Sequence, residues 1–239
     1  MRALPLGRTA ILVSILGAAF ALLVACSGDE DGGGDIADVD AQDVLDRSAD
    51  RMEQVESFHF EVEHENGATQ IIGGIAMEHA EGDVEGREAM QLEVEASFAG
   101  ANIKTGIIVL PEGAYLQNPL TGRWQQQDAI DISRLFDPRT GVTGLMREAT
   151  NVEVVDREAI DGVDSYVLEG TVDSGSLTSF VGTAEAGTPV TGRLWVGVED
   201  LLVRRIEVVR PIAPEDGDDI VRRITLSAFD EPVDISVPN

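Results

Sequence analysis

The sequence is poor in three residue classes: it has one cysteine, few basic residues and few aromatic residues. Because the single cysteine, Cys26, has no partner in the chain, no intrachain disulfide can form and packing must stabilise the fold. Only 17 residues are Lys or Arg, against 44 Asp or Glu, and the formal net charge is −27 at pH 7. Nucleic-acid binding depends on a basic surface, so we expect no nucleic-acid partner. A charge this large also favours a monomer.

Residues typical of catalytic and metal sites are also scarce. The three histidines are His59, His64 and His79, and no His-x-x-x-His or Cys-x-x-Cys spacing predicts a zinc site. The sequence has neither a Gly-x-Ser-x-Gly elbow nor a phosphate-binding glycine loop. We therefore expect no catalytic residues, no metal and no cofactor. The acidic run at 215–219 is either a weak calcium site or, as its incomplete ligand pattern favours, a solvated hairpin tip.

The first 26 residues have the pattern of an exported protein. Arg2 and Arg8 provide positive charge, and residues 9–25 form an uncharged, largely apolar segment. This segment is shorter than the ~20 apolar residues that a spanning helix needs. It ends in Leu23-Val24-Ala25-Cys26, which resembles the lipobox of bacterial lipoproteins.

The lipobox resemblance predicts how the chain is processed and divided. Residues 1–25 would be a signal peptide, and Cys26 would become the lipid-bearing first residue. Residues 26–41 are acidic and glycine-rich, as expected of a flexible tether, and residues 42–239 would form the folded domain. The lipid would hold the domain at the outer face of the cytoplasmic membrane. The alternatives are an ordinary signal peptide or a single anchor helix with an incidental cysteine.

Hydrophobic periodicity predicts one opening helix followed by a strand-rich domain. Residues 41–56 place Val44, Leu45, Ser48 and Met52 on one helical face. After Ser57 the apolar residues recur at every second position, which is typical of half-buried strands. Strands are predicted at 58–63, 70–78, 88–98, 103–110, 113–117, 151–157, 165–172, 190–198, 201–210 and 219–229.

Helical segments interrupt this series of strands. Short helices are predicted at 131–136, 142–150 and 174–184. The pattern therefore indicates an α+β fold with one antiparallel sheet of about ten strands. A sheet of this size should curve into a half-barrel, with helices packed on its concave face around a hydrophobic cavity.

Several segments resemble the LppX/LprG-type family of bacterial lipoproteins. The order of lipobox, acidic tether, opening helix and strand-rich domain matches that family over nearly all of residues 42–239. The most similar segments are Tyr115-Leu116-Gln117-Asn118-Pro119-Leu120-Thr121-Gly122-Arg123-Trp124, Asp161-Gly162-Val163-Asp164-Ser165-Tyr166, Leu194-Trp195-Val196 and Ile224-Thr225-Leu226-Ser227-Ala228-Phe229-Asp230. No single motif is diagnostic, and the order and spacing of the segments carry the resemblance.

The resemblance implies a half-barrel that binds lipids or glycolipids with several acyl chains and carries them through the envelope, with a lipid exporter as a further partner. The fold would be similar to that of periplasmic lipoprotein carriers. Strand alternation and the helical segments suggest the cavity residues: Phe60, Val62, Ile75, Leu92, Val94, Ile107, Tyr115, Leu135, Phe136, Leu145, Met146, Leu177 and Phe180. The alternative is an envelope scaffold or sensor domain with a core filled by side chains, which would bind a protein partner through an exposed apolar patch.

Overall fold

The computed structural model describes residues 36–71, 75–128, 141–177 and 187–237. They contain helix α1 (Ala41–Met52), helix α2 (Val142–Glu148) and a 3₁₀ turn, η2 (Ser174–Leu177). The strands are β1 (Ser57–Glu65), β2 (Thr69–Ile71), β3 (Ile75–Glu85), β4 (Ala89–Phe98), β5 (Ala101–Leu110), β6 (Gly113–Gln117), β7 (Trp124–Gln127), β8 (Thr150–Ile160), β9 (Val163–Asp173), β10 (Pro189–Gly197), β11 (Val203–Val209) and β12 (Val221–Ser227). Among these residues, no helix is both long and apolar enough to cross a membrane.

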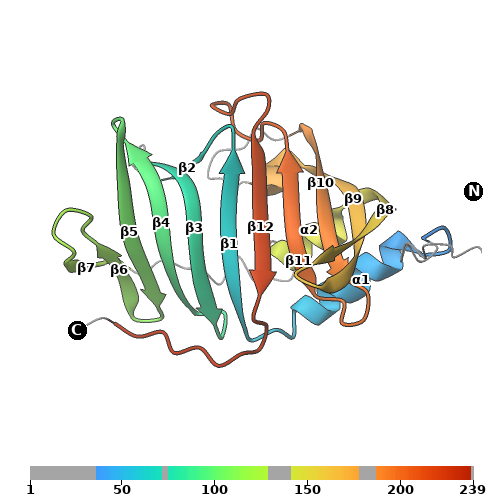
Figure 1. Ribbon diagram of the computed structural model, residues 1–239, viewed down its shortest axis with the longest axis horizontal. Helices are drawn as coiled ribbons and strands as arrows, with labels where there is room; N and C mark the ends of the chain where they lie inside the picture. The colour runs from blue at the N-terminus through green and yellow to red at the C-terminus, as the bar shows by residue number, and fades with distance from the viewer. Residues whose placement is uncertain (1–35, 72–74, 129–140, 178–186, 238–239) are drawn as a thin grey trace, which may run out of the picture. The chain divides into compact units, whose positions relative to one another are not determined.

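All the strands belong to one open antiparallel sheet (Figure 1). Its order is β7-β6-β5-β4-β3-β1-β12-β11-β10-β9-β8, with β2 paired to β3 outside this path. The first and last strands in sequence, β1 and β12, therefore lie side by side in the middle of the sheet. The predicted α+β class and curved antiparallel sheet are confirmed, with twelve strands in place of about ten.

Helix α1 forms where the sequence pattern predicts it but ends earlier. The Asp40 carboxylate caps its start by accepting hydrogen bonds from the backbone N–H groups of Gln42 and Asp43, at 3.0 and 3.1 Å. The helix ends at Met52, four residues before the predicted end at 56, because the chain must turn to enter β1 at Ser57. Its buried face packs against α2, β8 and β10. That face consists of Ala41, Val44, Leu45, Ser48 and Ala49.

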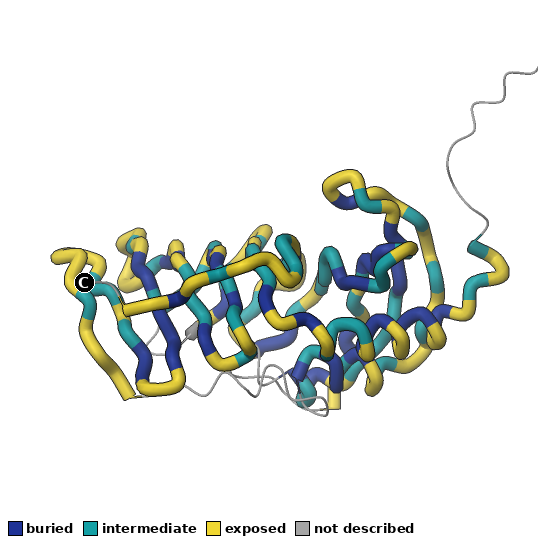
Figure 2. Tube along the Cα trace, turned by 90° about the horizontal axis from the view of Figure 1, so that it is seen from below, coloured by how far each residue is buried: buried dark blue, intermediate teal, exposed yellow. Residues whose placement is uncertain are grey.

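Successive side chains of a strand point to opposite faces of the sheet. Figure 2 shows that buried and exposed residues occur along the same strands. Phe60 on β1 lies opposite Leu226 on β12, and both belong to the main apolar cluster with the buried face of α1. Leu168 on β9 and Val196 on β10 come to the same cluster from the far half of the sheet. The helices therefore cover the concave face over strands β8–β12 (Figure 1).

One irregularity in β3 changes the predicted strand pattern. The segment expected as a single strand at 70–78 is divided between β2 and β3, and Gly73 and Gly74 lie outside the described residues. A register shift against β4 lies between Met77 and His79. This bulge returns Met77 to the concave face, where it lies opposite Ala96.

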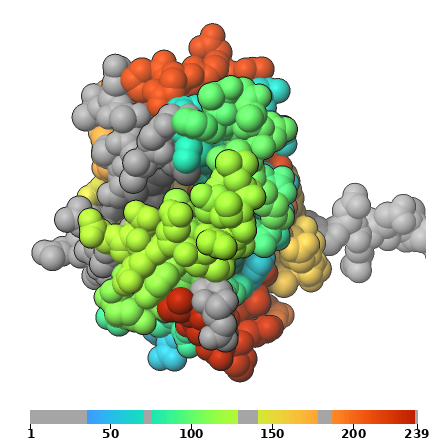
Figure 3. Space-filling view, turned by 90° about the vertical axis from the view of Figure 1, so that its left-hand side faces the viewer, coloured from blue at the N-terminus to red at the C-terminus, as the bar shows by residue number. Residues whose placement is uncertain are grey.

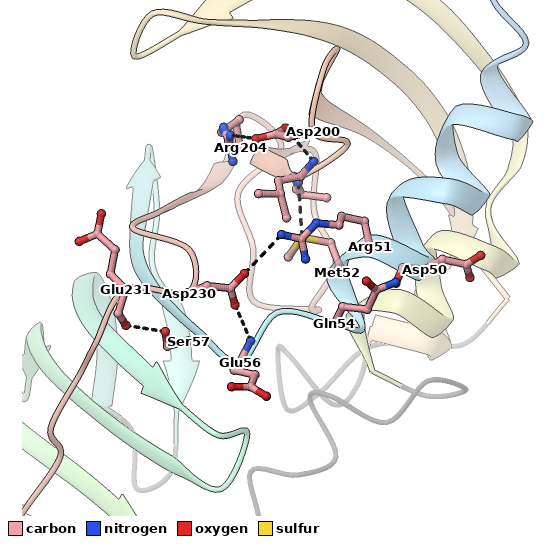
Figure 4. Close-up of polar contacts among 12 residues, drawn as sticks. Asp50, Arg51, Met52, Gln54, Glu56, Ser57, Asp200, Arg204, Asp230 and Glu231 are labelled. Carbon is pink, nitrogen blue, oxygen red and sulfur yellow. Dashed lines mark hydrogen bonds and ion pairs between the residues drawn. The ribbon is translucent and has the colours of Figure 1, made fainter.

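The segment after β12 is fixed to the start of β1. The Asp230 carboxylate accepts a hydrogen bond from the Glu56 backbone N–H at 2.9 Å and pairs with Arg51 of α1 at 3.3 Å (Figure 4). The Ser57 hydroxyl donates to the Glu231 carbonyl at 2.6 Å. Farther along, Ile235 packs with Leu110, and the C-terminal residues lie below strands β5–β7 in Figure 3. This segment therefore covers the lower ends of strands that are distant in sequence.

Candidate binding cavities

A first apolar cavity lies between the two helices and strands β8–β12. Its volume is about 200 Å³. Helices α1 and α2 contribute Leu45 and Leu145, while the sheet contributes residues from five strands, including Leu168 and Ile206. Val152, Val190 and Leu194 complete the central part of the wall.

A second and larger cavity lies beside the first, over β1, β3, β4 and β12. Its volume is about 420 Å³. Met52 at the end of α1 lines it, together with apolar residues of the sheet. These are Phe58, Phe60, Val62, Met77, Ala80, Val84, Met90, Leu92, Ile206, Ile224 and Leu226. The polar residues of this wall are few: Glu53, His64, Thr69, Arg87, Thr143 and Arg222.

The two cavities share part of their walls. Val142 from α2, Ile206 from β11, and Arg222 and Ile224 from β12 line both. Together the cavities fall within the ~300–1,000 Å³ typical of ligand sites. The domain therefore holds two adjoining apolar cavities whose common wall is called the junction below.

Arg222 is the charged residue at this junction, and its partner Asp216 is almost fully buried. The Arg222 Nη2 donates to Asp216 Oδ1 at 2.6 Å, and the two side chains are 8% and 1% exposed. The other oxygen, Asp216 Oδ2, accepts from the backbone N–H groups of Ile212 and Ala213 at 2.7 and 2.9 Å. Burial alone would raise the pKa of Asp216, but Arg222 and these backbone donors outweigh it and hold that pKa below its ordinary value.

A chain of hydrogen bonds links Arg222 to His64. The Arg222 Nε donates to Thr69 Oγ1 at 3.1 Å, and Thr69 Oγ1 lies 2.8 Å from His64 Nε2. On its other side His64 Nδ1 lies 2.9 Å from the Glu78 carbonyl, so Nδ1 is the protonated nitrogen of a neutral ring. Burial lowers the pKa of His64, and the Glu78 carbonyl and the positive charge of Arg222 act in opposite directions on it.

The lowered pKa of His64 predicts a loss of stability in mild acid. In the unfolded chain the ring binds a proton near pH 6.5, whereas in the fold it stays neutral to a lower pH. Its contribution is therefore complete above about pH 6.5 and is lost as the pH falls through the folded-state pKa. Urea unfolding between pH 7.5 and 5.5 should show a smaller pH dependence for His64→Gln than for the wild type. An equal pH dependence of the unfolding free energy in the two proteins would contradict a lowered pKa of His64.

Six of the residues predicted to line a cavity do line one. Phe60, Val62 and Leu92 line the second cavity. Leu145, Met146 and Leu177 line the first, and Leu145 and Met146 come from α2. Leu177 lies on η2, which the sequence pattern predicted as the start of a helix at 174–184. Leu135, Phe136 and Phe180 lie outside the described residues.

The other four predicted cavity residues line neither apolar cavity. Ile75, Val94 and Ile107 share one apolar cluster with Val62. Tyr115 was assigned to the wrong face. It lies opposite Ile108 on β5 and packs against the apolar cluster that contains Ile108 and Ile235 of the C-terminal segment.

Sequence reasoning missed the β11 and β12 side of the site. Ile206, Arg222 and Ile224 line both cavities, although strands were predicted at these positions. Alternation along β12 places Arg222, Ile224 and Leu226 on one face, so the pattern held the signal for a basic residue facing inward. Across the described residues, no cluster of three or more His, Cys, Asp or Glu side chains could hold a metal.

Comparison with protein families shows to which family the chain belongs. The model of the LppX_LprAFG lipoprotein family matches residues 40–235, which include every helix and strand of the fold. The chain belongs to this family. A relative in the family, the lipoarabinomannan carrier protein LprG of Mycolicibacterium smegmatis, is 23% identical over 236 residues, covering 95% of this chain and 94% of its own. The phthiocerol dimycocerosate transporter LppX of Mycobacterium tuberculosis, whose assignment is putative by name, is 26% identical over 140 residues, 56% of this chain and 55% of its own.

Solved structures of the family share the fold. LprF from Mycobacterium bovis superposes with a TM-score of 0.66 at 20% identity, covering 83% of this chain and 96% of its own. LppX from Mycobacterium tuberculosis gives a TM-score of 0.61 at 20% identity, with 82% and 98% covered. The curved sheet with helices on one face is therefore a feature of the LppX_LprAFG family and not of this chain alone.

Proposed function

We propose that this protein is a membrane-anchored lipoprotein that binds the acyl chains of a lipid or glycolipid in its two cavities and carries it within the cell envelope. The observation that carries the proposal is the pair of adjoining cavities lined almost wholly by apolar side chains. Water gains few hydrogen bonds from such walls, so hydrocarbon is the occupant that suits them.

Burial of hydrocarbon provides enough free energy for this function without a charged binding site. Each buried methylene contributes ~0.8 kcal/mol, so ten of them contribute on the order of 8 kcal/mol. Affinity then grows with the length and number of acyl chains. A catalytic constellation is not required for such a carrier, and we assign the protein no enzymatic role.

The names of the relatives support a lipid or glycolipid as the ligand class. One is named as a carrier of lipoarabinomannan, and another as a transporter of phthiocerol dimycocerosate. We infer that this chain carries a lipid or glycolipid of its own host and that an exporter in the envelope hands lipid to it. A scaffold or sensor role is disfavoured because it would suit a core filled by side chains.

If Cys26 carries the lipid anchor, its substitution should change where the protein is located without changing its lipid binding. Cys26→Ser should release the domain from the membrane fraction, because the acyl chains attached at that cysteine would provide the membrane affinity. The released protein should still yield lipid on organic extraction, because the cavities lie within residues 45–226. Fractionation and mass spectrometry of the extract measure the two effects. A folded Cys26→Ser protein without lipid would contradict the proposed lipid-carrier role. A Cys26→Ser protein that stays in the membrane fraction would contradict only the proposed attachment through Cys26.

A further inference from the structure

Arg222 has one donor group that the fold does not use. The residue is 7% exposed and lines both cavities. Its Nη2 is bonded to Asp216 and its Nε to Thr69, but the buried Nη1 has no hydrogen-bond partner among the described residues. A buried guanidinium nitrogen without a partner at a cavity wall requires an explanation.

Thr143 has a second unused group near the same place. The residue follows Val142 on α2, is 7% exposed and lines the second cavity. Its Oγ1 is also buried without a partner among the residues that the structure describes. Arg222 and Thr143 therefore both line the second cavity, Arg222 from strand β12 of the sheet and Thr143 from helix α2.

Unpaired polar groups in apolar surroundings destabilise the empty protein. A buried donor without an acceptor costs on the order of 1–3 kcal/mol. The neighbouring shared residues, Val142, Ile206 and Ile224, offer no side-chain acceptor. A ligand that brings an acceptor to the junction would remove this cost on binding, whereas a pure hydrocarbon would leave it.

We propose that Arg222 and Thr143 form a polar subsite that donates hydrogen bonds to the ester carbonyl groups of an acylated lipid. Both residues line the second cavity, and Arg222 also lines the first, so an ester held by Arg222 would allow its acyl chains to extend into either cavity. This inference rests on the proposed lipid-binding function and adds the group by which the lipid is recognised. It makes Arg222 and Thr143 determinants of specificity, while the apolar walls determine affinity.

The charge balance at the junction favours a neutral ester over an anionic head group. Asp216 already neutralises Arg222, and its second oxygen is held by two backbone N–H groups. A carboxylate or phosphate beside Arg222 would therefore leave a net negative charge in a buried site, at a desolvation cost of several kcal/mol. An ester carbonyl accepts the same hydrogen bonds without adding charge. We expect the site to prefer diacyl esters to free fatty acids.

Three lipids separate these possibilities. Dioleoylglycerol has two ester carbonyls, its dioleyl ether analogue has the same chains without carbonyls, and oleate has one chain and a charge. Competition against a fluorescent lipid measures the affinity of delipidated protein for each. The wild type should bind the diester about fivefold to tenfold more tightly than the diether, as the net contribution of one hydrogen bond provides, and oleate most weakly.

Two variants test whether Thr143 and Arg222 recognise the ester carbonyl groups. Thr143→Val removes one hydroxyl at nearly constant volume, and the double variant Arg222→Met/Asp216→Leu removes the guanidinium without leaving a buried charge. In each variant the ratio of diester affinity to diether affinity should fall close to one. The matched control Thr225→Val changes a residue on the opposite face of β12 and should keep the preference.

Each outcome has a distinct meaning. A diester preference that persists in both variants, or none in the wild type, would overturn the subsite, and ordered water would then be the partner of these donors. Tighter binding of oleate than of diester would overturn the charge argument. If no variant and no wild-type protein bound any of the three lipids, the proposed function itself would fail and the subsite with it.

Discussion

Ile224→Trp should empty the binding site of lipid. Ile224 lies in the middle of β12, opposite Val62 on β1 and Ile206 on β11, and its side chain lines both cavities. An indole at this position would fill the junction through which the two cavities adjoin. We expect at least a ~10-fold loss of lipid affinity, equivalent to about 1.4 kcal/mol, and no lipid in an organic extract of the purified variant. The affinity is measured by competition against a fluorescent lipid.

The neighbouring residue provides a matched control. Thr225 lies on the other face of the same strand, opposite Glu61 and Arg205. Thr225→Trp adds the same side chain outside the cavities and should leave lipid binding unchanged. Circular dichroism should show that both variants are folded. Full lipid occupancy in a folded Ile224→Trp protein would show that the junction is not part of the binding site.

Asp216→Ala should be among the most destabilising single changes in the domain. It removes the carboxylate that neutralises Arg222 and leaves a guanidinium buried among apolar residues. Removing one partner of a buried ion pair typically costs 3–5 kcal/mol. Urea unfolding of delipidated protein measures this loss as a fall in the free energy of unfolding, and delipidation separates it from any stabilisation by ligand.

Two further variants show whether the buried, unpaired charge of Arg222 causes the loss of stability in Asp216→Ala. Asp218 is an exposed aspartate two residues away, and Asp218→Ala should change the free energy of unfolding by less than about 0.5 kcal/mol. The double variant Arg222→Met/Asp216→Leu should recover most of the lost stability, because it removes both charges. Equal effects of Asp216→Ala and Asp218→Ala would contradict the account of the buried pair.

Alternation of apolar residues was sufficient to predict the inward face of the regular strands. Phe60, Val62 and Leu92 line a cavity as their spacing indicated. Tyr115 shows the limit of this reasoning. The tight turn after Leu110 brings Ala114 and Leu116 to the concave face and Tyr115 to the other, where it packs with Ile108. Alternation alone does not say which of the two alternating sets faces inward, and the register set by the turn decides the face.

The burial of Asp216 and its pairing with Arg222 could not be recognised from sequence, although alternation along β12 indicated that Arg222 faces inward. Asp216 lies in a run of acidic residues that has the composition of an exposed hairpin tip. Only the backbone N–H groups of Ile212 and Ala213, together with Arg222, distinguish it from its neighbours. These contacts depend on the path of the loop between β11 and β12, which side-chain periodicity does not specify. The packing of the C-terminal segment below β5–β7 is also a contact between residues distant in sequence, which periodicity does not specify.

Native mass spectrometry of the wild-type protein, purified in mild detergent from its own cell envelope, tests the central claim most directly. The account predicts a bound species whose removal by organic solvent yields a lipid with at least two ester-linked acyl chains. Release of that lipid should leave a folded protein that takes it up again. A protein that carries no lipid from its own envelope, and that takes up none when lipid is supplied, would contradict the account.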